Sequence, residues 1–566
     1  MLNTISYSAP AELESDLARE IDDWQAAGKI SRVWAKDASV WSGDDEAKWL
    51  GWLDIVEQES ANVQKYRDLS EDIRAGGFTE VLLMGMGGSS LCPEVLAMTF
   101  NKGQFHILDS TVPAQIETVK NKIDIDKTLF IVASKSGSTL EPNCFKQYFF
   151  DRVSGNVGST RAGQQFIAIT DPGSKMEQVA RADGFRHIFF GKPEIGGRFS
   201  ALSAFGLTAA ASMGLDVENF LSNASEMVDA CKTDDPRTNP GALLGLILGL
   251  CQRNGRDKLT IFASPEIHDL GAWLEQLIAE STGKNGVSII PVDREPFQPA
   301  ESYGNDRVFA FLSVKNGEGS DSQYDEVCAA GHPAVKIELD STENLGQEFF
   351  RWEFATAVAG GVMKINPFNQ PDVESAKIEA RKITDEYEKT GSLPAEQPFY
   401  EQDGFALYTS DKYAETLTSA AGERSLGGLI GAHIGQIGAG DYFGLLAYIE
   451  MNADNERVLS SIRSKVLEKT RAATCLGFGP RFLHSTGQGY KGGANNGVFL
   501  QITSDDKFDV PVPEQKYTFG VVKAAQARGD FQVLLDRGRR ALRVHLPADV
   551  GKGLAAILDL FSSRKK

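Results

Sequence analysis

Short apolar runs that end in small or polar residues recur along the chain, and helical stretches separate them. Between residues 80 and 190 these runs are EVLLMGMGGSS, FHILDST, TLFIVASKSGS, QFIAITDP and RHIFF. Continuous apolar strands that alternate with helices are typical of a parallel sheet covered on both faces. The pattern therefore predicts an α/β unit in this part of the chain.

The same pattern returns twice. A second set, KLTIFASPE, GVSIIPVD, RVFAFLSV and AVKIELD, precedes a predicted long amphipathic helix near residues 345–363. After a polar, proline-containing stretch near 390–400, a third and shorter set is predicted from VFLQIT, DFQVLLD and ALRVHLP. Residues 11–65 are predicted to be polar helices, anchored on the rest of the protein by their tryptophans Trp24, Trp34, Trp41, Trp49 and Trp52.

These patterns together predict an α/β protein of several domains, as expected for 566 residues. We predict a helical N-terminal segment at 1–70 and complete α/β domains at 71–213 and 214–395. A partial α/β domain follows at 396–566.

Charge and composition narrow the classes of function. The net charge is −19 and the pI is about 5.0, which argues against nucleic acid or an anionic membrane as a partner. The six cysteines form no CxxC pair and the seven histidines show no metal-ligand spacing, so we predict reduced thiols and no metal site. No run approaches the ~18 apolar residues of a membrane span, and the N-terminus shows no signal-like apolar core. The expected location is the cytoplasm.

Four hydroxyl side chains crowd the end of a predicted strand in LFIVASKSGSTLEPN, residues 129–143. Ligands of parallel α/β sheets collect beyond the carboxyl ends of the strands, where a helix start offers free N–H groups. Ser134, Ser136 and Thr139, with Lys135 among them, therefore suit a phosphate. The alternative is a serine-rich helix cap, but a cap needs only one hydroxyl.

The glycine-rich loop LLMGMGGSSLCP allows two interpretations. Asp109 follows at about the distance of the dinucleotide fingerprint, but Ser90 stands where the last glycine of that motif is required. We therefore interpret Gly87, Gly88 and Ser89 as a close backbone approach to a ligand, and we predict no nicotinamide cofactor.

Arg198 follows two glycines in GGRFSALSAFGL. This places the arginine at a tight turn before a helix of small apolar residues. A lone arginine is most often solvated or held in a structural ion pair, but the glycines beside Arg198 favour a side chain that faces a ligand.

Gln276 and Glu280 lie four residues apart in WLEQLIAESTGKNG and therefore share a helix face. Glu280 is near the carboxyl end of its predicted helix, where a negative charge is disfavoured. That position favours its protonated form, as suits a carboxylate that accepts and returns a proton. Spacing alone favours the alternative, an ordinary helix end.

Five of these loops, taken together, resemble those of the glucose-6-phosphate isomerase family. MGMGGSS, ASKSGST, GGRFSALSAFGL, QLIAESTGK and NPFNQPDVESAK follow one another in the family's order and approximate spacing, over roughly residues 70–385. The chain also resembles the isomerase portion of bacterial fusions with transaldolase, so a functional link to transaldolase is one implication.

The resemblance implies sugar-isomerase (SIS) domains at the first two α/β positions. It also implies interconversion of glucose 6-phosphate and fructose 6-phosphate through a cis-enediol, without metal or organic cofactor. The implied substrate-binding residues are Gly88, Ser89, Ser134, Lys135, Ser136, Thr139 and Gln276. Arg198 would steady the enediolate, Glu280 would move the proton between C2 and C1, and Lys377 would act in ring opening.

One family residue is missing from its place. The family carries a catalytic histidine about twenty residues after the glutamate, yet no histidine lies between His268 and His332. RFLHSTGQGYKGG, far downstream, resembles the family's histidine segment, and VFLQIT and FQVLLDRGRRALRVHLP resemble the end of a SIS domain. We therefore infer that 396–566 is a third, partial SIS-like domain and that His484 replaces the absent histidine. A capping or core histidine is the alternative.

In the two-domain family that histidine comes from the neighbouring subunit. A third domain could supply it within one chain, which leaves a pseudo-dimeric monomer and a homodimer with exchanged domains both open. The expected partner is a small-molecule sugar phosphate. The functional alternatives are a dual phosphoglucose/phosphomannose isomerase and a non-catalytic sugar-phosphate sensor.

Overall fold

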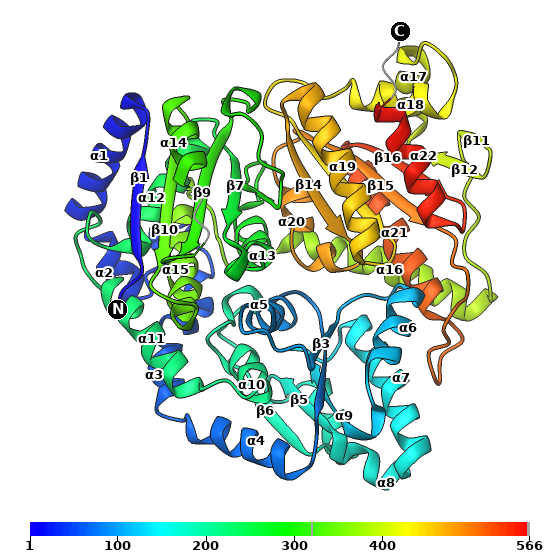
Figure 1. Cartoon of the computed structure of the whole chain (residues 1–566), viewed down its shortest axis with the longest axis horizontal. Helices are drawn as coiled ribbons and strands as arrows, with labels where there is room; N and C mark the ends of the chain where they lie inside the picture. Colours follow the sequence, from blue (N-terminus) through cyan, green and yellow to red (C-terminus); the bar gives the residue numbers. More distant parts are fainter. Residues whose placement is uncertain (318–320, 563–566) are drawn as a thin grey trace.

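Three β-sheets organise the protein, each flanked by helices (Figure 1). The structure, a computed structural model, describes residues 1–317 and 321–562. Within each sheet the central strands are parallel, so the predicted α/β fold with parallel sheets is confirmed. The division at the predicted boundary residues stays a prediction.

The first sheet has the order β3-β2-β4-β5-β6 and is parallel throughout. Its strands are β2 (Glu80–Gly85), β3 (Phe105–Leu108), β4 (Thr128–Ala133), β5 (Phe166–Thr170) and β6 (His187–Phe190). Its helices are α5 (Leu91–Thr99), α6 (Pro113–Lys122), α7 (Leu140–Val157), α8 (Ser159–Ala162), α9 (Lys175–Ala182) and α10 (Ala204–Ser212). The chain order reverses between β2 and β4, and such a reversal opens a ligand crevice at the carboxyl ends of the two strands.

The second sheet has the order β8-β7-β9-β10, with β1 added at the edge. Its parallel strands are β7 (Lys258–Ala263), β8 (Ile290–Asp293), β9 (Arg307–Val314) and β10 (Ala334–Leu339). The segment predicted as helical at 1–70 also contains a strand that the sequence did not indicate, because β1 (Thr4–Ser8) pairs antiparallel with β10. An exposed sheet edge offers unpaired N–H and C=O groups, and β1 satisfies them.

The rest of the N-terminal segment is helical and packs on both the first and the second unit. It contains α1 (Ala11–Ala26), α2 (Lys29–Trp34), α3 (Ile55–Ser60) and α4 (Gln64–Ala75). Trp24 and Trp52 are fully buried, and the Trp41 indole N–H donates to the carbonyl oxygen of Ala357 at 2.7 Å. The tryptophans anchor this segment as the sequence predicts.

The helix expected near 345–363 is present as α15 (Leu345–Met363), but it is not amphipathic. Every residue from Leu345 to Val362 is buried, among α11 (Val217–Ala230), α12 (Pro240–Arg253) and α13 (Leu270–Thr282). Arg351 of this helix binds the start of the chain, where it donates to the carbonyl oxygens of Asn3 and Thr4. The polar positions suggested a solvated face, but they are buried, and Arg351 among them anchors the N-terminal strand. The remaining helix of this unit is α14 (Asp321–Ala329).

The third sheet repeats the strand order of the second. The order β14-β13-β15-β16 is again parallel, and antiparallel β12 and β11 follow at the same edge that β1 occupies in the second sheet. The strands are β11 (Tyr400–Gln402), β12 (Phe405–Tyr408), β13 (Tyr442–Tyr448), β14 (Ala473–Phe478), β15 (Gly497–Ser504) and β16 (Arg540–Leu546). This shared topology supports the inference that the C-terminal part is a further SIS-like unit.

One predicted strand of this unit is a helix. DFQVLLD belongs to α21 (Phe519–Asp536), whereas VFLQIT and ALRVHLP form β15 and β16. A short apolar run does not by itself distinguish a strand from a buried helix. The other helices are α16 (Pro371–Thr390), α17 (Asp411–Ala420), α18 (Leu426–Ile434), α19 (Ala453–Thr470), α20 (Gly487–Gly492) and α22 (Val550–Ser562).

The second and third units meet through the edge strands β8 and β14. Cys475 donates to the carbonyl oxygen of Pro291, and the Arg463 guanidinium donates to the carbonyl oxygen of Asp293 at 2.9 Å. In Figure 1 these two units lie side by side, and the first unit lies across from both. Among the described residues, no helix is long and apolar enough to cross a membrane.

Candidate active site

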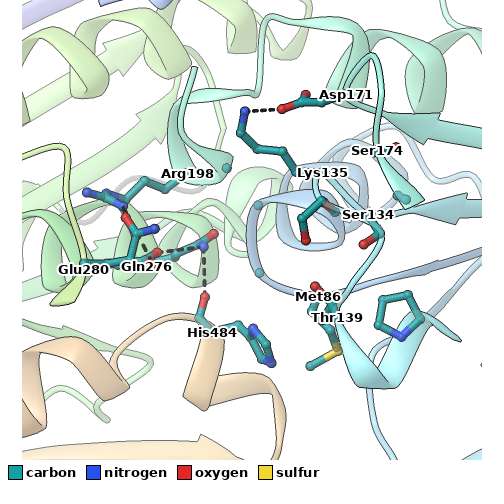
Figure 2. A pocket seen from close by; sticks show the side chains of 18 of the residues that line it. Met86, Ser134, Lys135, Thr139, Asp171, Ser174, Arg198, Gln276, Glu280 and His484 are labelled. Carbon is teal, nitrogen blue, oxygen red and sulfur yellow. Dashed lines mark hydrogen bonds and ion pairs between the residues drawn. The ribbon is translucent and has the colours of Figure 1, made fainter. Parts of the chain in front are cut away.

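All eleven residues predicted for the site line one cavity of about 480 Å³. They come from all three units and from α16, which connects the second unit to the third. Figure 2 shows Ser134, Lys135 and Thr139 on one side of the cavity and Glu280, Gln276 and Arg198 on the other, with His484 below. The residues are Gly88, Ser89, Ser134, Lys135, Ser136, Thr139, Arg198, Gln276, Glu280, Lys377 and His484. Their roles stay proposals.

The loop between β4 and α7 carries the predicted phosphate-binding hydroxyls. Gly137 has φ +68°, and a Cβ atom there would lie 2.1 Å from the backbone nitrogen of Met176, so the turn requires glycine. The Ser134 hydroxyl is buried without a hydrogen-bond partner. Thr139 occupies the N-cap position of α7, but its side chain makes no capping hydrogen bond. These hydroxyls are not used as a helix cap, which favours the anion-binding interpretation.

Lys135 lies at the rim of the cavity and has a carboxylate partner. Its Nζ is 2.5 Å from Asp171 Oδ2 and also donates to the carbonyl oxygens of Lys192 and Pro193. Burial raises the pKa of Asp171, and the neighbouring ammonium opposes that shift. Sequence reasoning missed Asp171 and Ser174, although both follow β5 in ITDPGS at the same edge of the sheet.

The glycine loop after β2 is shaped by other parts of the protein. A Cβ atom on Gly88 would lie 1.9 Å from the carbonyl oxygen of Gly197. One on Gly87 would lie 2.7 Å from Gln276 Nε2 and 2.8 Å from the carbonyl oxygen of His484. The absence of side chains therefore lets the loops that carry Arg198 and His484 close around one cavity.

The structure also argues against the dinucleotide interpretation. Asp109, the candidate for ribose binding, accepts a hydrogen bond from Ser90 Oγ at 3.0 Å and pairs with Arg481 Nε at 2.9 Å. Its carboxylate is 5% exposed, so it is already engaged inside the protein. Asp109 therefore stabilises the glycine loop after β2 and does not face a cofactor site.

Arg198 is buried at the junction of α13 and the loop before α16. Its Nε donates to Ser281 Oγ at 2.7 Å, and its Nη2 donates to the carbonyl oxygens of Pro367 and Asn369. Its Nη1 donates to Gln370 Oε1 at 3.0 Å. These groups fix the guanidinium in position and are all neutral.

The nearest carboxylate to Arg198 is that of Glu280, with 3.7 Å between Nη1 and Oε1. Burial lowers the pKa of Arg198, and Glu280 opposes that shift, so the side chain is a fixed cation at neutral pH. Because neutral groups hold most of its donors, its charge remains available to an oxyanion that develops beside Glu280.

Gln276 and Glu280 share one face of α13, as their spacing predicts. Gln276 Nε2 donates to Glu280 Oε2 at 3.0 Å and to the carbonyl oxygen of His484 at 2.9 Å. Both side chains are buried. Gln276 thus orients the carboxylate and ties the second unit to the third. The expectation that the helix end favours the protonated form of Glu280 stays a prediction.

His484 reaches the cavity within the same chain. It ends the short helical turn Arg481–His484 that follows β14. Its Nε2 lies 2.8 Å from Oε1 of Glu141, in the first turn of α7. Burial opposes ionisation of Glu141, but the His484 ring and Lys377 favour it, and the net pKa of Glu141 lies below its usual range.

Lys377 lies in the first half of α16, and its side chain is exposed at the mouth of the cavity. Sequence reasoning missed Glu141 and Gln370, although each lies within a quoted motif. Within the described ranges 1–317 and 321–562, no group of three or more His, Cys, Asp or Glu residues could hold a metal ion. The cavity brings together a hydroxyl-rich loop, a carboxylate beside a fixed guanidinium, and a histidine with a lysine.

Comparisons with known proteins find relatives that match part of this chain. The family model for phosphoglucose isomerase matches residues 50–293, which include the loops of the first unit, Arg198, Gln276 and Glu280. A probable glucose-6-phosphate isomerase of Methanococcus maripaludis is 28% identical over 373 residues, which cover 58% of this chain and 82% of that protein. A glucose-6-phosphate isomerase of Trichormus variabilis is 28% identical over 427 residues, which cover 67% of this chain and 79% of that protein.

Among solved structures, a hypothetical protein from Thermus thermophilus matches with a TM-score of 0.59 and 22% identity. The match covers 67% of this chain and 99% of that one, and it shows a shared fold. The family match and the curated relatives agree, and part of this chain, which includes residues 50–293, is similar to phosphoglucose isomerases.

Proposed function

We propose that this protein is a glucose-6-phosphate isomerase, which interconverts glucose 6-phosphate and fructose 6-phosphate. The observation that carries the proposal is the arrangement of one cavity. Glu280 lies 3.7 Å from the buried Arg198 guanidinium on one side, and the buried Ser134 hydroxyl has no partner on the other. The names of the relatives point to the same reaction. A coupled assay of the purified chain with glucose 6-phosphate and mannose 6-phosphate tests the activity and its selectivity at C2.

Substrate binding begins with the phosphate. The hydroxyls of Ser134, Ser136 and Thr139 and the free N–H groups at the start of α7 would hold its oxygens. These uncharged donors would hold the phosphate dianion with few cations, as suits a protein whose net charge is −19. The sugar carbons would then extend across the cavity toward Glu280.

Isomerisation needs one base that serves two adjacent carbons. Glu280 would remove the proton from C2 of the open-chain aldose, and the C–H electrons would form the C1–C2 double bond of the enediol. Arg198 would stabilise the oxygen that gains negative charge. Glu280 would then return the proton to C1, and the proton of the C2 hydroxyl would pass to the C1 oxygen, which leaves a carbonyl at C2 and a hydroxyl at C1.

Ring opening precedes this step for the cyclic sugar. It requires a proton at the ring oxygen and loss of a proton from the C1 hydroxyl. His484 and Lys377 line the same cavity and are proposed to exchange these protons. A non-catalytic sensor would need the phosphate loop, but it would not need Glu280, Lys377 and His484 around one ligand.

The proposed site requires no residue of a second copy of the chain. His484 follows β14 in the third unit, and that unit repeats the topology of the second. The third unit keeps the histidine that the second unit lacks. We infer that it takes the place of a partner subunit's domain, which makes the chain a pseudo-dimeric monomer at its active site.

Removal of the phosphate-binding hydroxyls should weaken binding rather than chemistry. Ser134→Ala combined with Thr139→Ala is expected to raise KM for the sugar phosphate by about 10- to 100-fold and to lower kcat by less than about threefold, because uniform binding is lost. Steady-state kinetics measure both constants. Ser154→Ala, which removes a buried hydroxyl farther along α7, is the control. An unchanged KM in the double variant would rule out phosphate binding by this loop.

Replacement of His484 should affect cyclic and open-chain substrates differently. His484→Ala is expected to slow turnover of glucose 6-phosphate by about 10²-fold. Proton exchange on a shorter sugar phosphate that cannot cyclise should stay within about threefold. His545→Ala removes a histidine of the same unit that pairs with Asp505, and it is the control. Equal loss on both substrates would remove His484 from ring opening.

A further inference from the structure

Gln526 is a buried amide of α21 that bridges two side chains of the first unit. Its Nε2 donates to Glu141 Oε1 at 2.6 Å, and its Oε1 accepts from Thr111 Oγ1 at 2.7 Å. The reverse orientation of the amide would place two oxygen acceptors against each other at the carboxylate. The hydroxyl of Thr111 and the charge of Glu141 therefore fix this amide in one orientation.

The oxygen of Glu141 that binds Gln526 is also the oxygen that binds His484. Oε1 accepts from Gln526 Nε2 at 2.6 Å and lies 2.8 Å from His484 Nε2. An ionised carboxylate can only accept, so Nε2 of the neutral imidazole carries the proton and Nδ1 is left as the acceptor. Gln526 and His484 thus share one acceptor atom.

We propose that Gln526 is a positioning residue that fixes the place and the protonation state of His484 through Glu141. The proposal rests on the proposed role of His484 in ring opening. Thr111 and Glu141 belong to the first unit, whereas His484 and Gln526 belong to the third. This chain of hydrogen bonds therefore also aligns the two units next to the cavity.

The charged neighbours of Glu141 explain why a neutral amide is suited to this position. The titratable groups that face Glu141 are His484, Lys377, Cys144 and Tyr448. Burial raises the pKa of Cys144 to about 12 and that of Tyr448 well above its usual value, so both are neutral at pH 7. Gln526 gives the buried carboxylate a second donor without adding a charge that would compete with His484.

The proposal predicts a change in the titration of His484. Gln526→Met removes the donor but nearly keeps the volume, so Glu141 Oε1 loses the donor that it shares with His484 and favours the imidazolium more strongly. The midpoint of His484 protonation should rise by about one pH unit. The acid limb of the pH profile of kcat for glucose 6-phosphate should move in the same direction. We expect kcat to fall by about tenfold, as for one hydrogen bond to a charged group, with KM changed by less than about twofold.

The test is an NMR titration of the full chain with ¹⁵N-labelled histidine, in which the signals of His484 are assigned from His484→Ala. The control is Gln532→Met, because Gln532 lies on the exposed part of the same helix and donates to Asp536. This variant should leave the midpoint of His484 protonation unchanged. Thr111→Val frees the Gln526 amide and should shift the midpoint in the same direction, but less. It provides the readout if Gln526→Met does not fold.

An unchanged midpoint in the folded variant would overturn the proposal, and so would a pH profile identical to that of the wild type. The titration requires no turnover. If the wild-type protein failed to isomerise sugar phosphates while the midpoint still moved, the proposed function would fail and the role of Gln526 would stand.

Discussion

Glu280→Gln is expected to lower kcat for glucose 6-phosphate by about 10³- to 10⁴-fold, the upper part of the range for loss of a positioned general base. The amide keeps the shape of the side chain, and its oxygen can still accept from Gln276 Nε2, which now donates to Glu280 Oε2. It cannot take the proton from C2. KM should change by less than about threefold, because the phosphate loop is untouched. Steady-state kinetics in both directions give the two constants.

Glu275→Gln is a matched control on the same helix. Glu275 faces Asp293 rather than the cavity, and burial raises its pKa to about 8. It is therefore protonated at neutral pH, and glutamine closely imitates that form. This variant should keep full activity. A near-normal kcat in Glu280→Gln would show that Glu280 is not the base.

Arg198→Ala is expected to lower kcat by about 10²- to 10³-fold, as for loss of a group that meets the transition-state oxyanion. The reason is the position of Nη1, 3.7 Å from the base and held by neutral partners. KM should change much less than kcat. Arg198→Lys should recover only part of the loss, because an ammonium cannot reproduce the fixed fork of a guanidinium.

Loss of stability must be separated from loss of chemistry in this variant. Arg198 also donates to the carbonyl oxygens of Pro367 and Asn369, and these become unpaired in Arg198→Ala. Thermal unfolding of Arg198→Ala measures the loss of stability. The control is Arg186→Ala, which removes a half-buried arginine that pairs with Asp72. A change confined to KM would make Arg198 a substrate-binding residue only.

The hydrophobic pattern predicted the sheets because most strands are continuous apolar runs. It failed where packing decides the structure. β1 is a strand only because the edge of β10 accepts it, and DFQVLLD is helical although its run is as short as a strand. The polar residues of α15 suggested a solvated face, but they are buried, and Arg351 among them binds the first residues of the chain. The pattern of neighbouring residues in the sequence cannot predict contacts between residues so far apart in the chain.

Site residues were predictable where they directly follow a strand or share one face of a helix. Ser134 and Thr139 follow β4, and Glu280 shares a helix face with Gln276. Glu141 and Gln526 were missed because their importance comes from contacts between units far apart in the chain. The resemblance to a known family, rather than spacing, indicated His484.

Proton transfer between C2 and C1 by Glu280 is the central claim, and it can be followed directly in D₂O by NMR. The purified protein should convert glucose 6-phosphate to fructose 6-phosphate, and fructose 6-phosphate to glucose 6-phosphate, until both reach the same equilibrium ratio. Because a carboxylic acid exchanges its proton with solvent, deuterium should appear at C1 of the ketose and C2 of the aldose. Glu280→Gln should slow both the conversion and the exchange by the same factor of about 10³ to 10⁴. Binding of the sugar phosphates without conversion or exchange by the wild-type protein would contradict the account.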